Sequence, residues 1–386
     1  MKTTCGNKFT KERWQACECL VIDEVSMLSA ELFEKLDVIA RKIRKSELVF
    51  GGIQLVAVGD FFQLPAVKAT RLCFQSDLWS KCFQRQHCIE LTKIYRQQDL
   101  VFTTMLDEIR DGTISTKTTM LLKELKRPLC KHNGVEATVL KTLNKDVNMM
   151  NKNCLLKLRK PIQTYVAIDS GEEPFLSRLK KTCNAEARLE LCEGAQVMLV
   201  RNISTTAKLC NGSRGVVTGF HSGLPQVQFI ALENPISVDI VKWSLTERRR
   251  VDEQLTYVDV AYRMQIPLKL AFAATIHKAQ GLTLEKTSIS LSNVFESGQA
   301  YVALSRARDL RSLQVCDFNM NSFKTNPACI AFAKQLTNIA EDAVLPACAP
   351  RGVWVNSAIF HCLCEEPSYD EVIIADKKKT RKRKIK

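Results

Sequence analysis

The chain has 386 residues, of which 46% are hydrophobic and 25% are charged. This balance excludes a short peptide and a globally disordered chain, and the length predicts about two to three domains. Lysine and arginine outnumber aspartate and glutamate by 56 to 41, and the resulting net charge of +15 indicates a polyanionic partner.

The first predicted elements alternate between strand and helix. A short apolar run at 19–22 ends in Asp23 and Glu24, and a second, longer apolar run occupies 53–58. Between them, apolar residues recur at helical spacing over 32–43, which predicts an amphipathic helix packed on a sheet. This order of elements is typical of α/β architecture with parallel strands.

Beyond about residue 91 the sequence predicts a second domain, helical at first and then entering a strand at 137–140. Short β runs separated by Asn-Gly, Ser-Gly and Pro turns follow, and they predict a small antiparallel barrel inserted in this domain. The α/β pattern then resumes, and no regular element is predicted beyond about residue 345. The predicted boundaries are 1–90 for the first domain with a short wedge region, 91–163 and 268–340 for the second domain, 164–267 for the barrel, and 341–386 for a C-terminal tail with a basic run.

The cysteines and the longest apolar run give no sign of secretion or of a membrane. Sixteen cysteines are scattered along the chain, and no hydrophobic signal segment stands at its N-terminus. We therefore expect reduced thiols in a reducing compartment. The longest apolar run, 48–62, is interrupted by Gly51, Gly52 and Gln54, so it falls short of the about 18 residues that a membrane helix needs. A membrane is not expected among the partners.

Polar side chains follow both predicted strands of the first domain. In LVIDEVSM, Asp23 and Glu24 come directly after the strand, and GDFFQLP places Asp60 and Gln63 after the next one. Open α/β sheets bind ligands at this carboxyl edge. One carboxylate there can hold Mg²⁺ and its neighbour can polarise an attacking water, while Gln63 can contact a terminal phosphate. A strand that ends in Asp-Glu can also simply meet solvent, but two adjacent strands ending in such groups favour a site.

Three further motifs fall in the second domain. LTKIYRQ places Arg96 near the domain junction, and GQAYVALSRAR places Arg306 on a helix. An arginine that one domain supplies to phosphates held on another stabilises phosphoryl transfer only when the cleft closes, although each arginine taken alone is more typical of a surface ion pair. The third motif, ATIHKAQGLT, follows a buried strand with a polar loop that contains Thr275, His277, Lys278 and Gln280.

Taken together, these motifs resemble those of one enzyme family. The chain contains, in this order, LVIDEVSM, GDFFQLP, LTKIYRQ, LDEIRDG, EGAQVMLVRN, NGSRGVV, ATIHKAQGLT and AYVALSRAR. The set resembles the superfamily 1B DNA helicases of the Pif type, which are related to RecD, and it runs from about Trp14 to Phe332. The resemblance implies two RecA-like motor domains, the first incomplete here, with a small β-barrel inserted in the second. It also implies ATP-driven 5′-to-3′ translocation on single-stranded DNA.

The resemblance assigns catalytic roles to five residues. Asp23 would help bind Mg²⁺, and Glu24 would be the catalytic carboxylate. Gln63 would contact the γ-phosphate of ATP, and Arg96 and Arg306 would be the finger residues. ATP and Mg²⁺ are therefore the implied cofactors.

The remaining assignments concern the coupling of nucleotide to DNA. Gln280 and Gly281 would lie in the motif that joins the state of the nucleotide to the grip on DNA, and both would contribute to nucleotide binding. Thr275, His277 and Lys278 would face the DNA. The implied partners are single-stranded DNA and forked or structured DNA, and a monomer is expected.

One motif of the family is missing. The phosphate loop GxxxxGK[ST], which the family carries before the Asp-Glu strand, occurs nowhere in the 386 residues. Because its backbone amides and lysine hold the phosphates, we expect this chain to have lost most ATP affinity. We favour the interpretation that the chain is an N-terminally truncated helicase, because the other catalytic residues are intact. The alternatives are a short product that binds DNA or partner proteins without hydrolysing ATP, and a passive single-strand binder that uses the barrel alone.

The C-terminal run KKKTRKRKIK carries eight of the basic residues, and without it the net charge is +7. Such a run suits nuclear import or nonspecific contact with nucleic acid, and a solvated tail is the alternative. We expect a nuclear protein, with a mitochondrial pool left open. The processes that the resemblance implies are DNA replication, recombination, repair and telomere maintenance.

Overall fold

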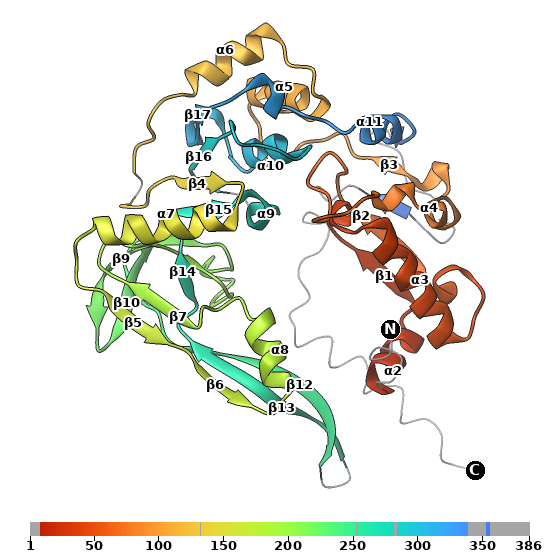
Figure 1. The fold of residues 1–386 in the computed structure, drawn as a ribbon, viewed down its shortest axis with the longest axis horizontal. Helices are drawn as coiled ribbons and strands as arrows, with labels where there is room; N and C mark the ends of the chain where they lie inside the picture. Colours follow the sequence, from red (N-terminus) through yellow and green to blue (C-terminus); the bar gives the residue numbers. More distant parts are fainter. Residues whose placement is uncertain (1–7, 132, 252–253, 282–283, 339–352, 356–386) are drawn as a thin grey trace. The chain divides into compact units, whose positions relative to one another are not determined.

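The computed structural model describes residues 8–131, 133–251, 254–281, 284–338 and 353–355, and the chain divides into two compact units (Figure 1). The first unit comprises Met1–Phe61, Pro65–Arg96 and Pro327–Lys386, and the second comprises Phe62–Leu64 and Gln97–Asn326. The basic run of the predicted tail lies outside the described residues. Within the described part of the chain, no helix combines the length and the apolarity that a membrane crossing requires.

The first unit is built on a parallel sheet of three strands in the order β1-β2-β19. Strand β1 (Cys19–Ile22) pairs with β2 (Gln54–Val58), so that Leu20 lies opposite Leu55. The other edge of β2 pairs with β19 (Val353–Val355), where no regular element was predicted. That prediction was wrong because three residues are too short a run to show a strand period, and their pairing depends on a partner about 300 residues away in the sequence.

Helix α3 (Ala30–Arg44) confirms the predicted amphipathic segment. Ser29 caps its first turn by accepting a hydrogen bond from the Leu32 N–H at 3.2 Å, and Lys45 ends it in the left-handed conformation. Its buried face includes Phe33, whose ring lies 5.1 Å from that of Phe50. The other elements of this unit are α2 (Lys8–Ala16), η1 (Val25–Met27), η2 (Val49–Gly52), η3 (Cys73–Gln75), α4 (Asp77–Cys82), η4 (Arg85–His87), β3 (Ile89–Glu90), α11 (Pro327–Ala333) and β18 (Thr337–Asn338).

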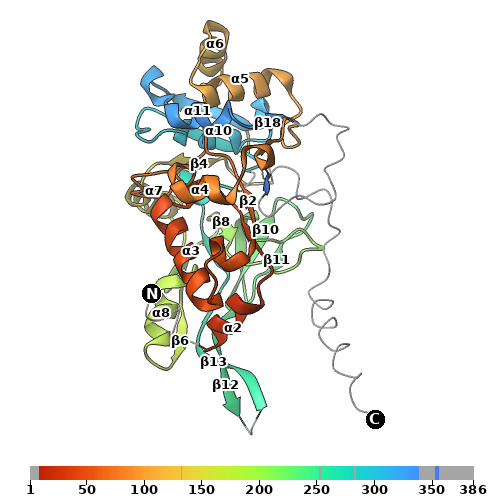
Figure 2. The same ribbon diagram turned by 90° about the vertical axis from the view of Figure 1, so that its right-hand side faces the viewer.

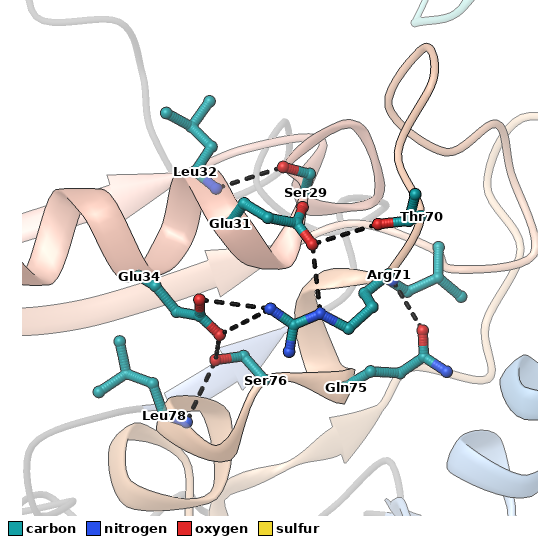
Figure 3. Close-up of polar contacts among 10 residues, drawn as sticks. Ser29, Glu31, Leu32, Glu34, Thr70, Arg71, Gln75, Ser76 and Leu78 are labelled. Carbon is teal, nitrogen blue, oxygen red and sulfur yellow. Dashed lines mark hydrogen bonds and ion pairs between the residues drawn. The ribbon is translucent and has the colours of Figure 1, made fainter.

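A polar network ties α3 to the loop that precedes η3 (Figure 3). Arg71 donates from Nε to Glu31 at 3.2 Å and from Nη2 to Glu34 at 3.2 Å, and Ser76 Oγ donates to Glu34 at 2.8 Å. The charged side chains are more than a third exposed, so solvent and salt screen both ion pairs and each contributes little to stability. The network therefore fixes the path of this loop more than it stabilises the fold.

Helix α11 packs in the first unit, although the sequence prediction placed residues 327–340 in the second domain. The thiol of Cys329 donates to the carbonyl of Phe61 at 3.1 Å, and the ring of Phe332 stacks on that of Phe74 at 4.4 Å. These contacts join residues more than 250 positions apart in the sequence, which local periodicity cannot reveal.

The second unit has a four-stranded sheet in the order β15-β4-β16-β17, with every pair parallel, as the α/β prediction requires. Its buried core includes Leu140 from β4, Ile289 from β16 and Val315 from β17, together with Phe102 and Met105 from α5. The elements around this sheet are α5 (Leu100–Asp111), α6 (Thr116–Glu124), β4 (Thr138–Lys141), α7 (Asn144–Lys157), β15 (Ala273–Thr275), α9 (Ile276–Ala279), β16 (Thr287–Ser290), α10 (Gln299–Ser305), η5 (Leu310–Ser312), β17 (Leu313–Asp317) and η6 (Met320–Ser322).

The segment predicted to be a barrel is antiparallel, and its described strands pair in the order β11-β10-β9-β8-β14. In this order the first and last strands do not pair with each other, so closure of the sheet into a barrel stays a prediction. A long hairpin of β12 and β13, with β6 beside β13, projects from the rest of the unit (Figures 1 and 2). The strands and helix here are β5 (Gln163–Val166), β6 (Ile168–Gly171), α8 (Phe175–Thr182), β7 (Arg188–Leu191), β8 (Gln196–Leu199), β9 (Arg214–His221), β10 (Leu224–Phe229), β11 (Ile236–Ser237), β12 (Val241–Val251), β13 (Gln254–Gln265) and β14 (Leu268–Leu270).

A bidentate ion pair fastens β6 to the hairpin. Arg263 donates from Nε and Nη2 to the two oxygens of Asp169 at 2.7 and 2.8 Å, and from Nη1 to the carbonyl of Ala185 at 2.7 Å. The side chain of Arg263 is 4% exposed and that of Asp169 is 17% exposed. The hydrogen bonds from Arg263 hold the pKa of Asp169 below its ordinary value of 3.8.

Replacing Asp169 by Asn is expected to lower the free energy of unfolding by about 2–4 kcal/mol, because the buried guanidinium loses its charge partner. Glu190→Gln is the matched control, since Glu190 accepts from Arg188 at 2.8 Å on the exposed surface and should contribute less than about 1 kcal/mol. A lowered carboxyl pKa stabilises the fold above the unfolded-state pKa, so the advantage of the wild type over Asp169→Asn should disappear as the pH falls through the folded-state pKa. Urea unfolding at several pH values measures both effects, and equal losses in the two variants would contradict the role given to burial.

Candidate nucleotide and DNA sites

Strand β1 delivers Asp23 and Glu24 to the carboxyl edge of the first unit's sheet. Asp23 is exposed and accepts a hydrogen bond at Oδ1 from the Glu24 N–H at 2.8 Å. Glu24 is half-buried and adopts the left-handed conformation, with φ 49° and ψ 47°. For a residue with a side chain this conformation costs about 1 kcal/mol, and such strain concentrates at functional positions. The backbone thus turns sharply at the residue to which the sequence assigns the chemistry.

Gly59 brings the end of β2 against this turn. It has φ +152°, and a Cβ at this position would lie 2.8 Å from the backbone nitrogen of Val25, so a side chain cannot fit. The next residue, Asp60, is 5% exposed. Because β1 and β2 are parallel neighbours, Asp60 ends its strand at the same sheet edge as Asp23 and Glu24. Sequence reasoning identified the acidic ending of β2 but did not include Asp60 among the site residues.

The donor chemistry of this edge fits Mg²⁺. Magnesium prefers carboxylate oxygens and is commonly held by one or two of them, with waters and substrate phosphates completing its shell. Asp23 presents an exposed carboxylate of this kind. Among the described residues there is no cluster of three or more metal-ligating side chains.

Gln63 and Arg306 come together in the second unit. Arg306 follows α10, is 1% exposed, and donates from Nε to the carbonyl of Val302 at 3.0 Å. Its Nη2 lies 3.5 Å from Oε1 of Gln63, at the edge of hydrogen-bonding distance. The sequence placed these residues in different domains and gave no measure of their separation.

Two further contacts hold the segment Phe62–Leu64 in place. At Gly298, which precedes α10 and has φ +78°, an added Cβ would lie 2.3 Å from the carbonyl oxygen of Phe62, so only glycine allows this approach. On the other side, the guanidinium of Arg110 in α5 lies 3.9 Å from the ring centre of Phe62. The LDEIRDG motif, whose role the sequence left open, thus contributes an arginine that holds the segment carrying Gln63.

The ATIHKAQGLT motif is split between β15 and α9. Thr275 is buried and caps α9 by accepting from the Lys278 N–H at 3.3 Å. Nε2 of the partly buried His277 lies 3.4 Å from a carboxylate oxygen of Glu296, and Lys278 is exposed. Gln280 follows the helix as a half-buried residue, and the exposed Gly281 has φ +77°. The DNA-facing and nucleotide-coupling roles of this motif stay predictions, with Lys278 presented to solvent.

Arg96 is exposed and lies in a stretch that is neither helix nor strand. It belongs to the first unit with Asp23 and Glu24, whereas Gln63, Arg306 and the ATIHKAQGLT residues belong to the second. The catalytic assignments therefore fall into two groups, each carried by one unit. The roles assigned to all of these residues remain predictions.

Comparisons with known proteins identify the class. Residues 4–120 match the family described as PIF1-like helicase, and residues 174–220 match the 2B domain of DNA helicase Pif1. The human ATP-dependent DNA helicase PIF1 is 42% identical over 330 residues, which cover 83% of this chain and 50% of the human protein. The chain thus spans about half the length of this relative.

Solved structures of Pif1 helicases also match this chain. The crystal structure of Pif1 helicase from Candida albicans matches with a TM-score of 0.72 and 33% identity, covering 87% of this chain and 81% of that one. Pif1 helicase from Bacteroides in complex with ADP-AlF3 and single-stranded DNA matches with a TM-score of 0.60 and 29% identity, covering 85% and 77%. The chain has the α/β fold of helicases with RecA-like motor domains. It belongs to the Pif1 family of superfamily 1B helicases.

Proposed function

We propose that the chain is the motor part of an ATP-dependent DNA helicase that moves 5′-to-3′ along single-stranded DNA. The observation that carries the proposal is the contact between Gln63 and Arg306, which Gly298 permits and Arg110 supports. An amide and a guanidinium held together are suited to recognise the terminal phosphate of a nucleotide and the charge that develops on it. The names of the matched relatives support ATP-dependent DNA helicase activity, and the 5′-to-3′ direction rests on the resemblance of the motifs.

In the proposed cycle of ATP hydrolysis, the residues of each unit perform a separate task. Glu24 orients and polarises the attacking water, and Asp23 would hold Mg²⁺, which neutralises charge on the phosphates. Gln63 and Arg306 respond to the terminal phosphate, and Arg96 adds a second cation. Gln280 and Gly281 pass the state of the nucleotide to Thr275, His277 and Lys278, so that the grip on DNA alternates with hydrolysis.

The phosphate loop is the part of this machinery that the 386 residues lack. We propose that this chain binds DNA by itself. We also propose that ATP turnover requires a phosphate loop in the same polypeptide. The second candidate function is a DNA-binding product without ATP hydrolysis, which the absence of the loop motif favours.

The binding half of the proposal is tested on the chain itself. With a net charge of +15, its affinity for a labelled single-stranded oligonucleotide should fall about 10- to 100-fold between 50 and 200 mM salt, as expected for roughly three to five phosphate contacts. Added ATP should leave the affinity of this chain unchanged. Fluorescence anisotropy measures both effects, and failure to bind at low salt would contradict every DNA-based function considered for the chain.

The biological setting is also a proposal. We propose a monomeric nuclear protein, with a mitochondrial pool left open, that acts on single-stranded and forked DNA in replication, recombination, repair and telomere maintenance. The nuclear part rests on the basic run Lys377–Lys386. Replacing these basic residues by Gln in a fluorescent fusion should reduce its nuclear fraction.

A further inference from the structure

A buried asparagine on α7 forms hydrogen bonds with the backbone of the edge strand β15. Asn151 is 8% exposed, and its Nδ2 donates to the carbonyl of Ala273 at 3.2 Å while its Oδ1 accepts from the Ala273 N–H at 2.8 Å. Val147 and Leu155, one turn before and one turn after, are buried apolar residues on the same stripe of the helix. A polar side chain in such a stripe requires partners, and Asn151 finds both in a single peptide residue.

The position of Ala273 explains why this contact matters. β15 is only three residues long and lies at the end of the sheet order, so β4 is its sole strand partner among the described residues. The carbonyl of Phe272 accepts from the Val139 N–H of β4 at 2.9 Å, which leaves the N–H and C=O of the next residue, Ala273, pointing away from the sheet. A primary amide carries the same donor and acceptor pair as a peptide group, so Asn151 takes the place of a neighbouring strand.

The same short strand leads directly into ATIHKAQGLT, the motif that is proposed to face DNA. Thr275 ends β15 and caps α9, which carries His277 and Lys278. We infer that Asn151 is the positioning residue that sets the place of β15 and, through it, the presentation of Lys278 to DNA. This inference rests on the proposed function, because it assumes that ATIHKAQGLT contacts DNA.

The test uses the whole chain and a matched control on the same helix. Asn151→Ala removes both hydrogen bonds, whereas Asn153→Ala makes the same change at an exposed position. We expect Asn151→Ala to weaken binding of single-stranded DNA about 3- to 10-fold at a temperature where both variants are folded, and Asn153→Ala to change it less than about twofold. Hydrogen exchange should accelerate over 273–281 in the first variant and not over β16.

A double-variant cycle separates positioning from general destabilisation. If Asn151 acts through α9, combining Asn151→Ala with Lys278→Ala should weaken binding no more than the larger single loss, because both changes remove the same contact. Additive losses, or normal affinity in Asn151→Ala, would overturn the inference. If Lys278→Ala alone leaves the affinity unchanged, the DNA role of the motif fails instead. Should Asn151→Ala not fold, Asn151→Ser, which keeps one polar atom, takes its place in the same measurements.

Discussion

Replacing Glu24 by Gln is expected to lower DNA-stimulated ATP turnover about 10²- to 10⁴-fold in a form of the protein that carries the phosphate loop. The amide keeps the size of the side chain but cannot accept a proton from the attacking water. The backbone at Glu24 is left-handed, and it should survive the substitution because Gln, like Glu, is unbranched at Cβ and has the same size. Affinity for single-stranded DNA should stay within about twofold of the wild type, since no DNA role is assigned to Glu24.

The matched control for this prediction is Glu47→Gln, which makes the same change at an exposed glutamate of the same unit. Its turnover should equal that of the wild type. Turnover retained by Glu24→Gln would remove the catalytic role from this residue and direct attention to Asp60 at the end of the neighbouring strand.

Replacing Arg306 by Lys should lower turnover about 10³-fold while changing DNA affinity little, because an arginine finger stabilises charge that develops only in the transition state. Lysine keeps the positive charge but loses the planar guanidinium that reaches Gln63 at 3.5 Å and the Val302 carbonyl at 3.0 Å. Arg308→Lys, two residues further along and exposed, is the matched control. Steady-state kinetics measures the loss of turnover in the two variants, and oligonucleotide titration measures the loss of DNA affinity. Equal losses of turnover and of DNA affinity in Arg306→Lys would make Arg306 a DNA contact.

Local sequence patterns were sufficient for the parts of the fold that depend on near neighbours. The apolar run before Asp23 forms β1, and the helical spacing over 32–43 forms α3 with Ser29 as its cap. The sequence analysis missed β19 and the placement of α11, because both depend on contacts between residues far apart in the sequence. β19 pairs with β2, and the thiol of Cys329 donates a hydrogen bond to the carbonyl of Phe61. The length of the β12–β13 hairpin was also missed, since the charged run at 247–250 interrupts the apolar alternation that marks a strand.

The candidate site was likewise predictable from the sequence only in part. Motif order predicted Asp23, Glu24, Gln63 and Arg306 as site residues, but it could not show that the last two lie in contact. The close approaches at Gly59 and Gly298 depend on backbone from distant segments, so the sequence showed two glycines and no reason for them. Asn151 left a usable signal, because it interrupts an apolar stripe between Val147 and Leu155. A buried polar residue in such a stripe indicates a specific partner.

The most direct test of the helicase account is strand displacement by the protein translated from the native transcript, with any coding sequence upstream of the Met1 codon included. The substrates are a labelled duplex with a 5′ single-stranded tail and the same duplex with a 3′ tail. We expect the translated protein to carry a phosphate loop and, with ATP and Mg²⁺, to displace the strand only from the 5′-tailed duplex. A protein that carries the loop, binds both substrates and unwinds neither, or that unwinds from the 3′ tail, would contradict it.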